Sequence, residues 1–320
     1  MYLFPRTPAS QPGNRSGCSG APESAGRVRL CPSVSGLLVL CVMIGVSACG
    51  RFGEKSTQAS GTDRVVCVSK QINEFMYAIG AEQHLVAVDL TSIYPPQIKK
   101  LPTVGYHRAL SAEGIISMKP TLFLTDGNVG PSAVLEQLKQ VGIPIAVMPP
   151  GNTLDSAQQL LVQLGDRFGR RQAADSVLAQ WKAGMQDIWK DTAQYAGRKK
   201  PRVLIIHFGQ IANDYLAVKA GGPADDMIRW AGGENAVDSV GGMMRLTPEL
   251  IARIAPDIIV ATDLGFDRYG SAAKFATMPG IALTPAGKSL RIYRITEQEL
   301  LYFGPRTPGT VRQLRADFHA

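Results

Sequence analysis

Cysteine is scarce in the part of this 320-residue sequence that is expected to fold. Four of the five cysteines (Cys18, Cys31, Cys41 and Cys49) lie near the N-terminus, and only Cys67 follows them. A lone cysteine excludes an intramolecular disulfide, a cysteine-based zinc site and an iron–sulfur cluster from the folded part.

Catalytic motifs and concentrated basic charge are missing as well. The sequence contains no Gly-rich phosphate loop, no nucleophile elbow and no cluster of catalytic carboxylates, so it makes no case for an enzyme. Basic residues outnumber acidic ones by 34 to 26, but the longest basic run is only Arg198-Lys199-Lys200. Without a zinc motif or an RNA-binding aromatic strand, this scattered excess does not indicate nucleic-acid binding.

An export signal is the first feature that is present. Residues 36–48 are uncharged and apolar and follow Arg27 and Arg29, an order typical of a signal peptide. The run is too short for a good membrane-spanning helix. We therefore predict an extracytoplasmic, periplasmic location, and a non-cleaved anchor is the alternative.

The apolar run ends in a short motif that resembles a bacterial lipobox. Small residues precede Cys49, which such a motif would make the lipidated first residue of the mature chain. We predict a leader over residues 1–49, a flexible polar tether over residues 50–62, and membrane attachment through a lipid on Cys49.

Short apolar segments alternate with helical segments through the rest of the chain, which predicts an α/β fold with parallel sheets. A proline-free stretch at 155–195 interrupts the alternation, and a helix over 173–195 would run about 35 Å. We predict two Rossmann-like lobes joined by one long connecting helix: an N-terminal lobe at 63–151, a connecting helical segment at 152–198 and a C-terminal lobe at 199–320.

The two predicted lobes repeat one motif. Residues 111–121 align with residues 247–257, and both segments place a helix-capping Ser or Thr and a Glu before a Pro and an apolar strand. Two similar lobes leave a cleft between them, and α/β proteins bind ligands in such clefts.

The loops that follow the predicted strands supply the candidate site residues. Tyr94, in a Pro-rich loop, can be a packing residue, a hydrogen-bond donor or a ferric iron ligand. Arg108, just before a predicted helix, and Arg245, its counterpart in the second lobe, can meet an anion or be surface residues. His207 can ligate a metal or be a structural histidine. The loop at 263–270 completes the set.

From about Arg64 to Arg315 the chain resembles the haem-binding proteins of bacterial haem ABC importers. The helix–Pro–strand repeat is shared with iron-siderophore and cobalamin binders, whereas the YHRALSAEG and ALTPAG segments are more specific to haem binders. The residues that carry the resemblance are TSIYPP around Tyr94, VGYHRALSAEG (104–114), KPTLFL (119–124), VLEQLKQVGIP (134–144), AGGENAV (231–237), PGIALTPAG (279–287) and FGPRTP (303–308).

This resemblance implies a fold and a function. The fold would be a class III periplasmic binding protein with a helical backbone. The protein would be the substrate-binding component of an ABC importer, not an enzyme, and would deliver ferric haem to a permease dimer with a cytoplasmic ATPase. The alternative is a ferric-siderophore or cobalamin binder of the same fold. Glu82 and Glu234, one on each lobe, would be candidates for docking on the permease.

The resemblance also assigns roles to the candidate residues. Tyr94 would ligate the haem iron, and arginines would assist the tyrosinate or pair with the propionates, with Arg108 the first choice before Arg245 and Arg268. His207 would be a second iron ligand, which the unusual Phe208 and Gln210 after it put in doubt. Apolar cover for the porphyrin would come from Ile93, Tyr106, Met243, Met244 and Phe266.

Overall fold

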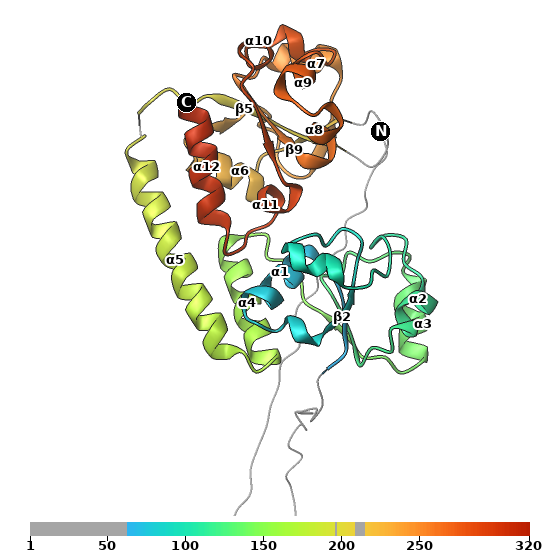
Figure 1. Cartoon of the computed structure of the whole chain (residues 1–320). Coiled ribbons are helices and arrows are strands. Elements are labelled where there is room, and N and C mark those ends of the chain that lie inside the picture. Colours follow the sequence, from blue (N-terminus) through green and yellow to red (C-terminus); the bar gives the residue numbers. More distant parts are fainter. Residues whose placement is uncertain (1–62, 196, 209–214) are drawn as a thin grey trace, which may run out of the picture. The chain divides into compact units, whose positions relative to one another are not determined.

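The computed structural model describes residues 63–320 except residue 196 and residues 209–214 (Figure 1). The described residues belong to one compact unit of the chain. The predicted leader, tether and lipidation site at Cys49 lie outside the described residues. Within the described part, no helix is long and apolar enough to cross a membrane.

The N-terminal lobe is built on a four-stranded parallel sheet of spatial order β2-β1-β3-β4. The two central strands read VVCV and LFLT and are buried throughout, as expected for a parallel sheet covered on both faces. The elements of this lobe are β1 (Val65–Val68), α1 (Lys70–Ala78), β2 (Leu85–Val88), α2 (Ala112–Ser117), β3 (Leu122–Thr125), α3 (Ala133–Gln140) and β4 (Ile145–Val147), with 3₁₀ turns at Glu82–His84 and Pro96–Lys100.

The C-terminal lobe has a six-stranded sheet of order β10-β9-β5-β6-β8, with β7 paired to β5. Its strands are β5 (Arg202–Phe208), β6 (Tyr215–Val218), β7 (Glu234–Asn235), β8 (Met243–Arg245), β9 (Ile258–Thr262) and β10 (Ile292–Ile295). Its helices are α6 (Pro223–Trp230), α7 (Pro248–Ile254), α8 (Asp263–Tyr269), α9 (Ala272–Ala276), α10 (Pro285–Ser289), α11 (Glu297–Leu301) and α12 (Thr307–His319), with a 3₁₀ turn at Ile281–Leu283.

Part of this second sheet corrects the sequence analysis. We expected parallel strands, but β6 pairs antiparallel with β5 and with β8. The chain between β5 and β6, residues 209–214, is too short for the crossover that a parallel pair requires. The segment 263–270, expected to be a loop, forms α8, and Met243 and Met244 lie in β8. The predicted α/β class is confirmed, and the predicted domain limits remain a prediction.

The connecting segment contains two helices, α4 (Leu154–Arg167) and α5 (Arg171–Ala193) (Figure 1). The helix expected over 173–195 is observed as α5, and Gly169, which has a positive φ of 64°, separates it from α4. The two helices pack closely because Gly165 has no side chain: a Cβ there would lie 2.5 Å from the Cβ of Ala174. α12 packs against α5, where Gly184 similarly makes room for Pro308.

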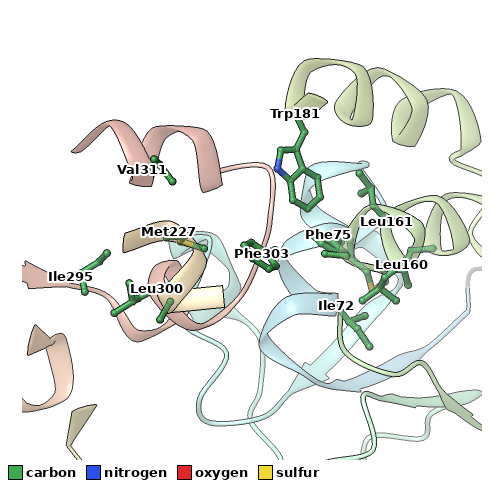
Figure 2. Close-up of a cluster of buried hydrophobic side chains, with 14 of the residues drawn as sticks. Ile72, Phe75, Leu160, Leu161, Trp181, Met227, Ile295, Leu300, Phe303 and Val311 are labelled. Carbon is green, nitrogen blue, oxygen red and sulfur yellow. The ribbon is translucent and has the colours of Figure 1, made fainter. Parts of the chain in front are cut away.

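One apolar core connects both sheets to these helices. Figure 2 shows Trp181 of α5 facing Phe75 of α1, with Phe303 beside them. The rings of Phe75 and Trp181 lie 6.0 Å apart, and Phe303 packs against Trp230 of α6 at 5.6 Å. All the labelled side chains of this cluster are buried, so both lobes contribute to one shared core.

Replacing Trp181 by alanine should lower the free energy of unfolding by about 3–5 kcal/mol, because it leaves a large cavity in this shared core. Trp189 lies on the same helix but is 45% exposed, so Trp189→Ala should cost less than about 1 kcal/mol. Urea unfolding followed by circular dichroism measures both changes. Equal losses in the two variants would contradict the shared core.

Candidate functional site

A cavity of about 730 Å³ lies at the carboxyl ends of strands from both sheets. The N-terminal lobe contributes residues that follow β2 and β3, and the C-terminal lobe contributes the end of β5, helix α8 after β9 and helix α11 after β10. Loops after strands are where α/β sheets expose polar groups to a ligand. The volume falls in the range of roughly 300–1,000 Å³ typical of small-molecule sites.

A second cavity of about 730 Å³ lies between α5, β10 and α12. Of its three arginines, Arg294 pairs with Asp267, Arg306 pairs with Glu74 and Glu299, and Arg312 is exposed. The cavity at the strand ends is the stronger candidate because it lies at the carboxyl ends of the strands, the favoured position for a ligand in this kind of fold.

Six of the sequence-predicted residues line the candidate cavity. These are Ile93, Tyr106, Arg108, His207, Met243 and Arg268. Arg108 comes from the N-terminal lobe and Arg268 from α8 of the C-terminal lobe, and within the described part of the chain neither forms an ion pair. Leu90, Leu216 and Leu264 add apolar surface. The cavity thus combines apolar surface with one guanidinium group from each lobe and with the charged side chains of Lys70, Asp263 and Glu297.

Tyr94 does not line this cavity. The guanidinium of Arg306 lies over its ring, 3.5 Å from the centroid. Arg306 is held in turn by Glu74 and Glu299, at 2.8 and 2.9 Å. The structure therefore keeps Tyr94 in a cation–π contact outside the group of residues that line the cavity.

Three other predicted residues also lie apart from the cavity lining. Met244 and Phe266 pack against the core of the C-terminal lobe, and Phe266 stacks on Phe275 at 5.7 Å. Met243 lines the cavity and its neighbour Met244 does not, because successive residues of strand β8 point to opposite faces of the sheet. Arg245 shares the face of Met243 and pairs in register with Leu216, but it is not a lining residue.

His207 is oriented by a hydrogen-bonding partner. Its Nδ1 lies 3.3 Å from the hydroxyl of the fully buried Thr262, which leaves Nε2 as the ring nitrogen available to a ligand. Burial lowers the pKa of His207, so the imidazole is neutral at neutral pH. Phe208, the unusual residue after it, is buried against Gly265, where a Cβ would lie 1.5 Å from the ring. Gly265 thereby fixes how closely α8 approaches His207.

The structure adds polar groups that the sequence analysis did not select. Lys70 and Glu297 form a 2.9 Å ion pair between α1 and α11 at the edge of the cavity, with side chains only 11% and 19% exposed. Tyr302 lies beside them, and burial together with Glu297 raises its pKa, so its hydroxyl stays protonated. No motif marks these residues because each faces the site only through a contact between the two lobes.

His107 is a further missed residue, although it stands in the quoted YHRALSAEG segment. It lines the cavity and also a smaller polar pocket with Asp89, Asp126 and Asn128. Burial lowers the pKa of His107, with the nearby Lys70 acting in the same direction. The sequence could have indicated His107 as a candidate, because it lies directly between two candidate residues, Tyr106 and Arg108.

The two candidate docking acids lie outside the cavity lining. Glu82 is half-buried, and its Oε2 has no hydrogen-bond partner among the described residues. Glu234 lies in β7 and is exposed. Of the two, Glu234 presents its carboxylate more openly to a partner.

Comparison with known proteins was made at the level of family, sequence and structure. The sequence model of the family described as "Periplasmic binding protein" matches residues 65–299. An uncharacterised ABC transporter substrate-binding lipoprotein, YvrC of Bacillus subtilis, is 25% identical over 254 residues, 78% of each chain. The vitamin B12-binding protein of Pectobacterium atrosepticum is 30% identical over 147 residues, 46% of this chain and 52% of that protein.

Similar solved structures include two proteins described as binding heme. The apo form of the periplasmic heme-binding protein RhuT from Roseiflexus sp. RS-1 is 32% identical, with a TM-score of 0.74 over 81% of this chain and 98% of that one. BhuT, solved with two hemes, is 30% identical, with a TM-score of 0.72 over 81% and 100%. The vitamin B12-binding protein BtuF of Vibrio cholerae, at 21% identity and a TM-score of 0.64, shares the fold.

The ion pair between Lys70 and Glu297 provides a test of the cavity edge. Glu297→Gln should lower the free energy of unfolding by about 1–3 kcal/mol, because it leaves a mostly buried ammonium without its carboxylate. The exposed pair of Glu136 and Lys139 is the matched control, and Glu136→Gln should cost less than about 1 kcal/mol. Chemical denaturation of both variants measures the difference. A loss no larger than the control's would mean that the pair does not stabilise the contact between the lobes.

Proposed function

We propose, since the chain belongs to the periplasmic binding protein family, that the ligand of its cavity is ferric haem. The protein is the substrate-binding component of an ABC transporter and not an enzyme, and its fold is the class III type of that family. Its partners are accordingly a permease and an ATPase, and its place of action is outside the cytoplasm. The identity of the ligand is the part that is proposed.

The observation that carries the proposal is the pair of arginines in a cavity with apolar surface. Haem is a flat apolar ring with two carboxylates and a ferric ion. Arg108 and Arg268 offer one guanidinium each to the carboxylates, and Ile93, Met243 and Leu264 offer apolar surface to the ring. Methionine suits such a flat face because its side chain is flexible and polarisable.

Cobalamin and ferric siderophores fit a cavity with two arginines and a neutral histidine less well than haem does. Cobalamin carries neutral amide side chains and a single phosphodiester, which would leave one of the two guanidinium groups without an anion. A ferric siderophore saturates its iron with oxygen ligands, so the neutral imidazole of His207 would have no role. Cobalamin remains the second candidate because vitamin B12-binding proteins are among the relatives. Among the solved structures, the proteins described as heme-binding are more similar to this chain, at 32% and 30% identity and TM-scores of 0.74 and 0.72, than the vitamin B12-binding protein BtuF, at 21% and 0.64.

We assign the iron ligation to Tyr94, with His207 as a ligand from the opposite lobe. A phenolate oxygen and a neutral imidazole nitrogen are both suitable ligands for ferric haem. The ring of Tyr94 lies under Arg306. In the proposed loading, Tyr94 leaves this contact and turns its hydroxyl toward the cavity.

Delivery to the membrane completes the proposed cycle. A lipid on Cys49 and a tether at 50–62 would hold the protein at the membrane surface. The exposed carboxylate of Glu234, with Glu82 on the other lobe, would meet basic groups of the permease. Haem would be released there without covalent chemistry, in keeping with the family to which the chain belongs.

Titration of the purified protein with haemin, a ferric siderophore and cyanocobalamin tests the ligand directly. We expect haemin alone to bind and to give a ferric absorption spectrum distinct from that of free haemin. Arg108→Gln and Arg268→Gln should each weaken binding about tenfold, because each loses a charge-assisted hydrogen bond. Arg253→Gln, an exposed arginine outside the cavity, is the control. Binding of cyanocobalamin in preference to haemin would overturn the proposal.

Tyr94→Phe tests the iron ligand. The variant should shift the ferric haem spectrum and weaken binding by about tenfold or more, because it removes only the phenolic oxygen. Tyr77→Phe, in helix α1 and outside the cavity, should leave the spectrum unchanged. A wild-type spectrum in Tyr94→Phe would remove Tyr94 as the ligand.

A further inference from the structure

The backbone around His107 is fixed against the neighbouring loop. Ala109 N donates to Tyr106 O at 2.8 Å, and Gly130 N donates to His107 O at 2.9 Å. Leu110 N donates in turn to Gly130 O at 2.9 Å. Gly130 permits this close approach because a Cβ there would lie 2.9 Å from Arg108 O. The turn that presents His107 is therefore set in place before any ligand arrives.

The side chain of His107 faces the cavity with uncommitted nitrogens. Its ring packs edge-on against Tyr106 at 4.4 Å and lines both the large cavity and the small polar pocket beside it. Within the described part of the chain, neither ring nitrogen of His107 has a hydrogen-bond partner. His207 differs, because Thr262 engages its Nδ1. A neutral imidazole with a free lone pair is a good ligand for iron.

Tyr94 and His107 both belong to the N-terminal lobe, but only His107 lines the cavity. Arg306 holds the ring of Tyr94, and Arg306 is itself fixed by two carboxylates. An incoming haem would therefore meet His107 before Tyr94 has turned. Because both side chains come from the same lobe, they would approach the same face of the porphyrin and could not bind the iron together.

From this arrangement we propose that His107 is an iron-binding residue of the cleft, an alternative to Tyr94 on the N-terminal face of the haem. The inference rests on the proposed function, since it names a further ligand for the same cargo. His107 binds the ferric iron while Tyr94 is held by Arg306, and it yields that position when the phenolate arrives. The N-terminal lobe then offers two iron ligands of different chemistry. The imidazole nitrogen of His107 binds first, and the phenolate oxygen of Tyr94 replaces it.

The test removes the competing ligand first. Ferric haemin is titrated into wild type and into Tyr94→Phe, and the optical and electron paramagnetic resonance spectra are recorded. We expect Tyr94→Phe to retain haem with the low-spin spectrum of a ferric ion bound by two imidazoles, those of His107 and His207. Adding His107→Gln to Tyr94→Phe should abolish this two-imidazole spectrum and raise Kd a further tenfold or more. Glutamine keeps a hydrogen-bonding group but does not supply an imidazole.

Two matched variants in the Tyr94→Phe background separate His107 from the other histidines. His319→Gln changes a histidine that stacks on Tyr195 outside the cavity, and it should have no effect. His207→Gln should leave the iron bound by the one imidazole of His107 and should therefore give a single-imidazole spectrum. Persistence of the Tyr94→Phe spectrum after His107→Gln would overturn the inference.

A measurement on the unmutated protein guards against variants that fail to fold. Diethyl pyrocarbonate modifies neutral imidazoles, and mass spectrometry locates the modified histidines. Haemin should protect His107, whereas iron-free protoporphyrin should protect it less. Equal protection by the two porphyrins would assign His107 to covering the ring and overturn its role as an iron ligand. Failure of wild type to take up haemin at all would instead overturn the proposed function.

Discussion

The ion pairs of Arg306 are the interaction on which the site depends. The guanidinium binds both carboxylate oxygens of the buried Glu74 in α1 and one oxygen of Glu299 in α11. Gln298 donates a further hydrogen bond to Glu74. Removing one partner of such a buried pair leaves an uncompensated charge, which is far more costly than losing an exposed ion pair. The segment around Arg306 is therefore held firmly on the N-terminal lobe, and the ring of Tyr94 packs on its guanidinium.

The cavity depends on these ion pairs, because the chain just before Arg306, from Glu297 to Tyr302, lines one of its sides. Gln71 of α1 donates hydrogen bonds to the carbonyls of Gly151 and Phe303, and Lys70 pairs with Glu297. Phe303 and Glu297 lie more than 200 positions from the residues of α1 that they contact, and Gly151 lies 80 positions away. Polar groups satisfied in this way leave little freedom for the lobes to separate, since the apolar core around Trp181 is shared as well. We infer that ligand entry involves side chains at the cavity more than movement of whole lobes.

The limits of the sequence analysis have the same physical origin. Apolar runs, capping residues and prolines act over a few positions, so the parallel strands, the loop that carries Arg108 and the strand end that carries His207 were predictable, whereas Met243 was expected in a loop and lies in β8. The antiparallel strand β6 was missed because pairing partners depend on connection length, which the helix–strand alternation of the rest of the chain obscured. The contact of Arg306 with Tyr94 could not be predicted, because no local pattern encodes a contact across 212 positions. Tyr302 was missed for the same reason.

The strength of the contact between Arg306 and Tyr94 determines its effect on ligand uptake. A partly exposed cation–π contact is worth about 0.5–2 kcal/mol. A free energy of this size, set against ligand affinity, reduces the apparent binding constant by roughly 2- to 30-fold. The contact is therefore too weak to prevent the proposed ligation by Tyr94 and strong enough to delay it. The proposed site must both bind haem and release it to a permease. A contact of this strength suits both steps, because the free energy that favours the unligated tyrosine also favours release.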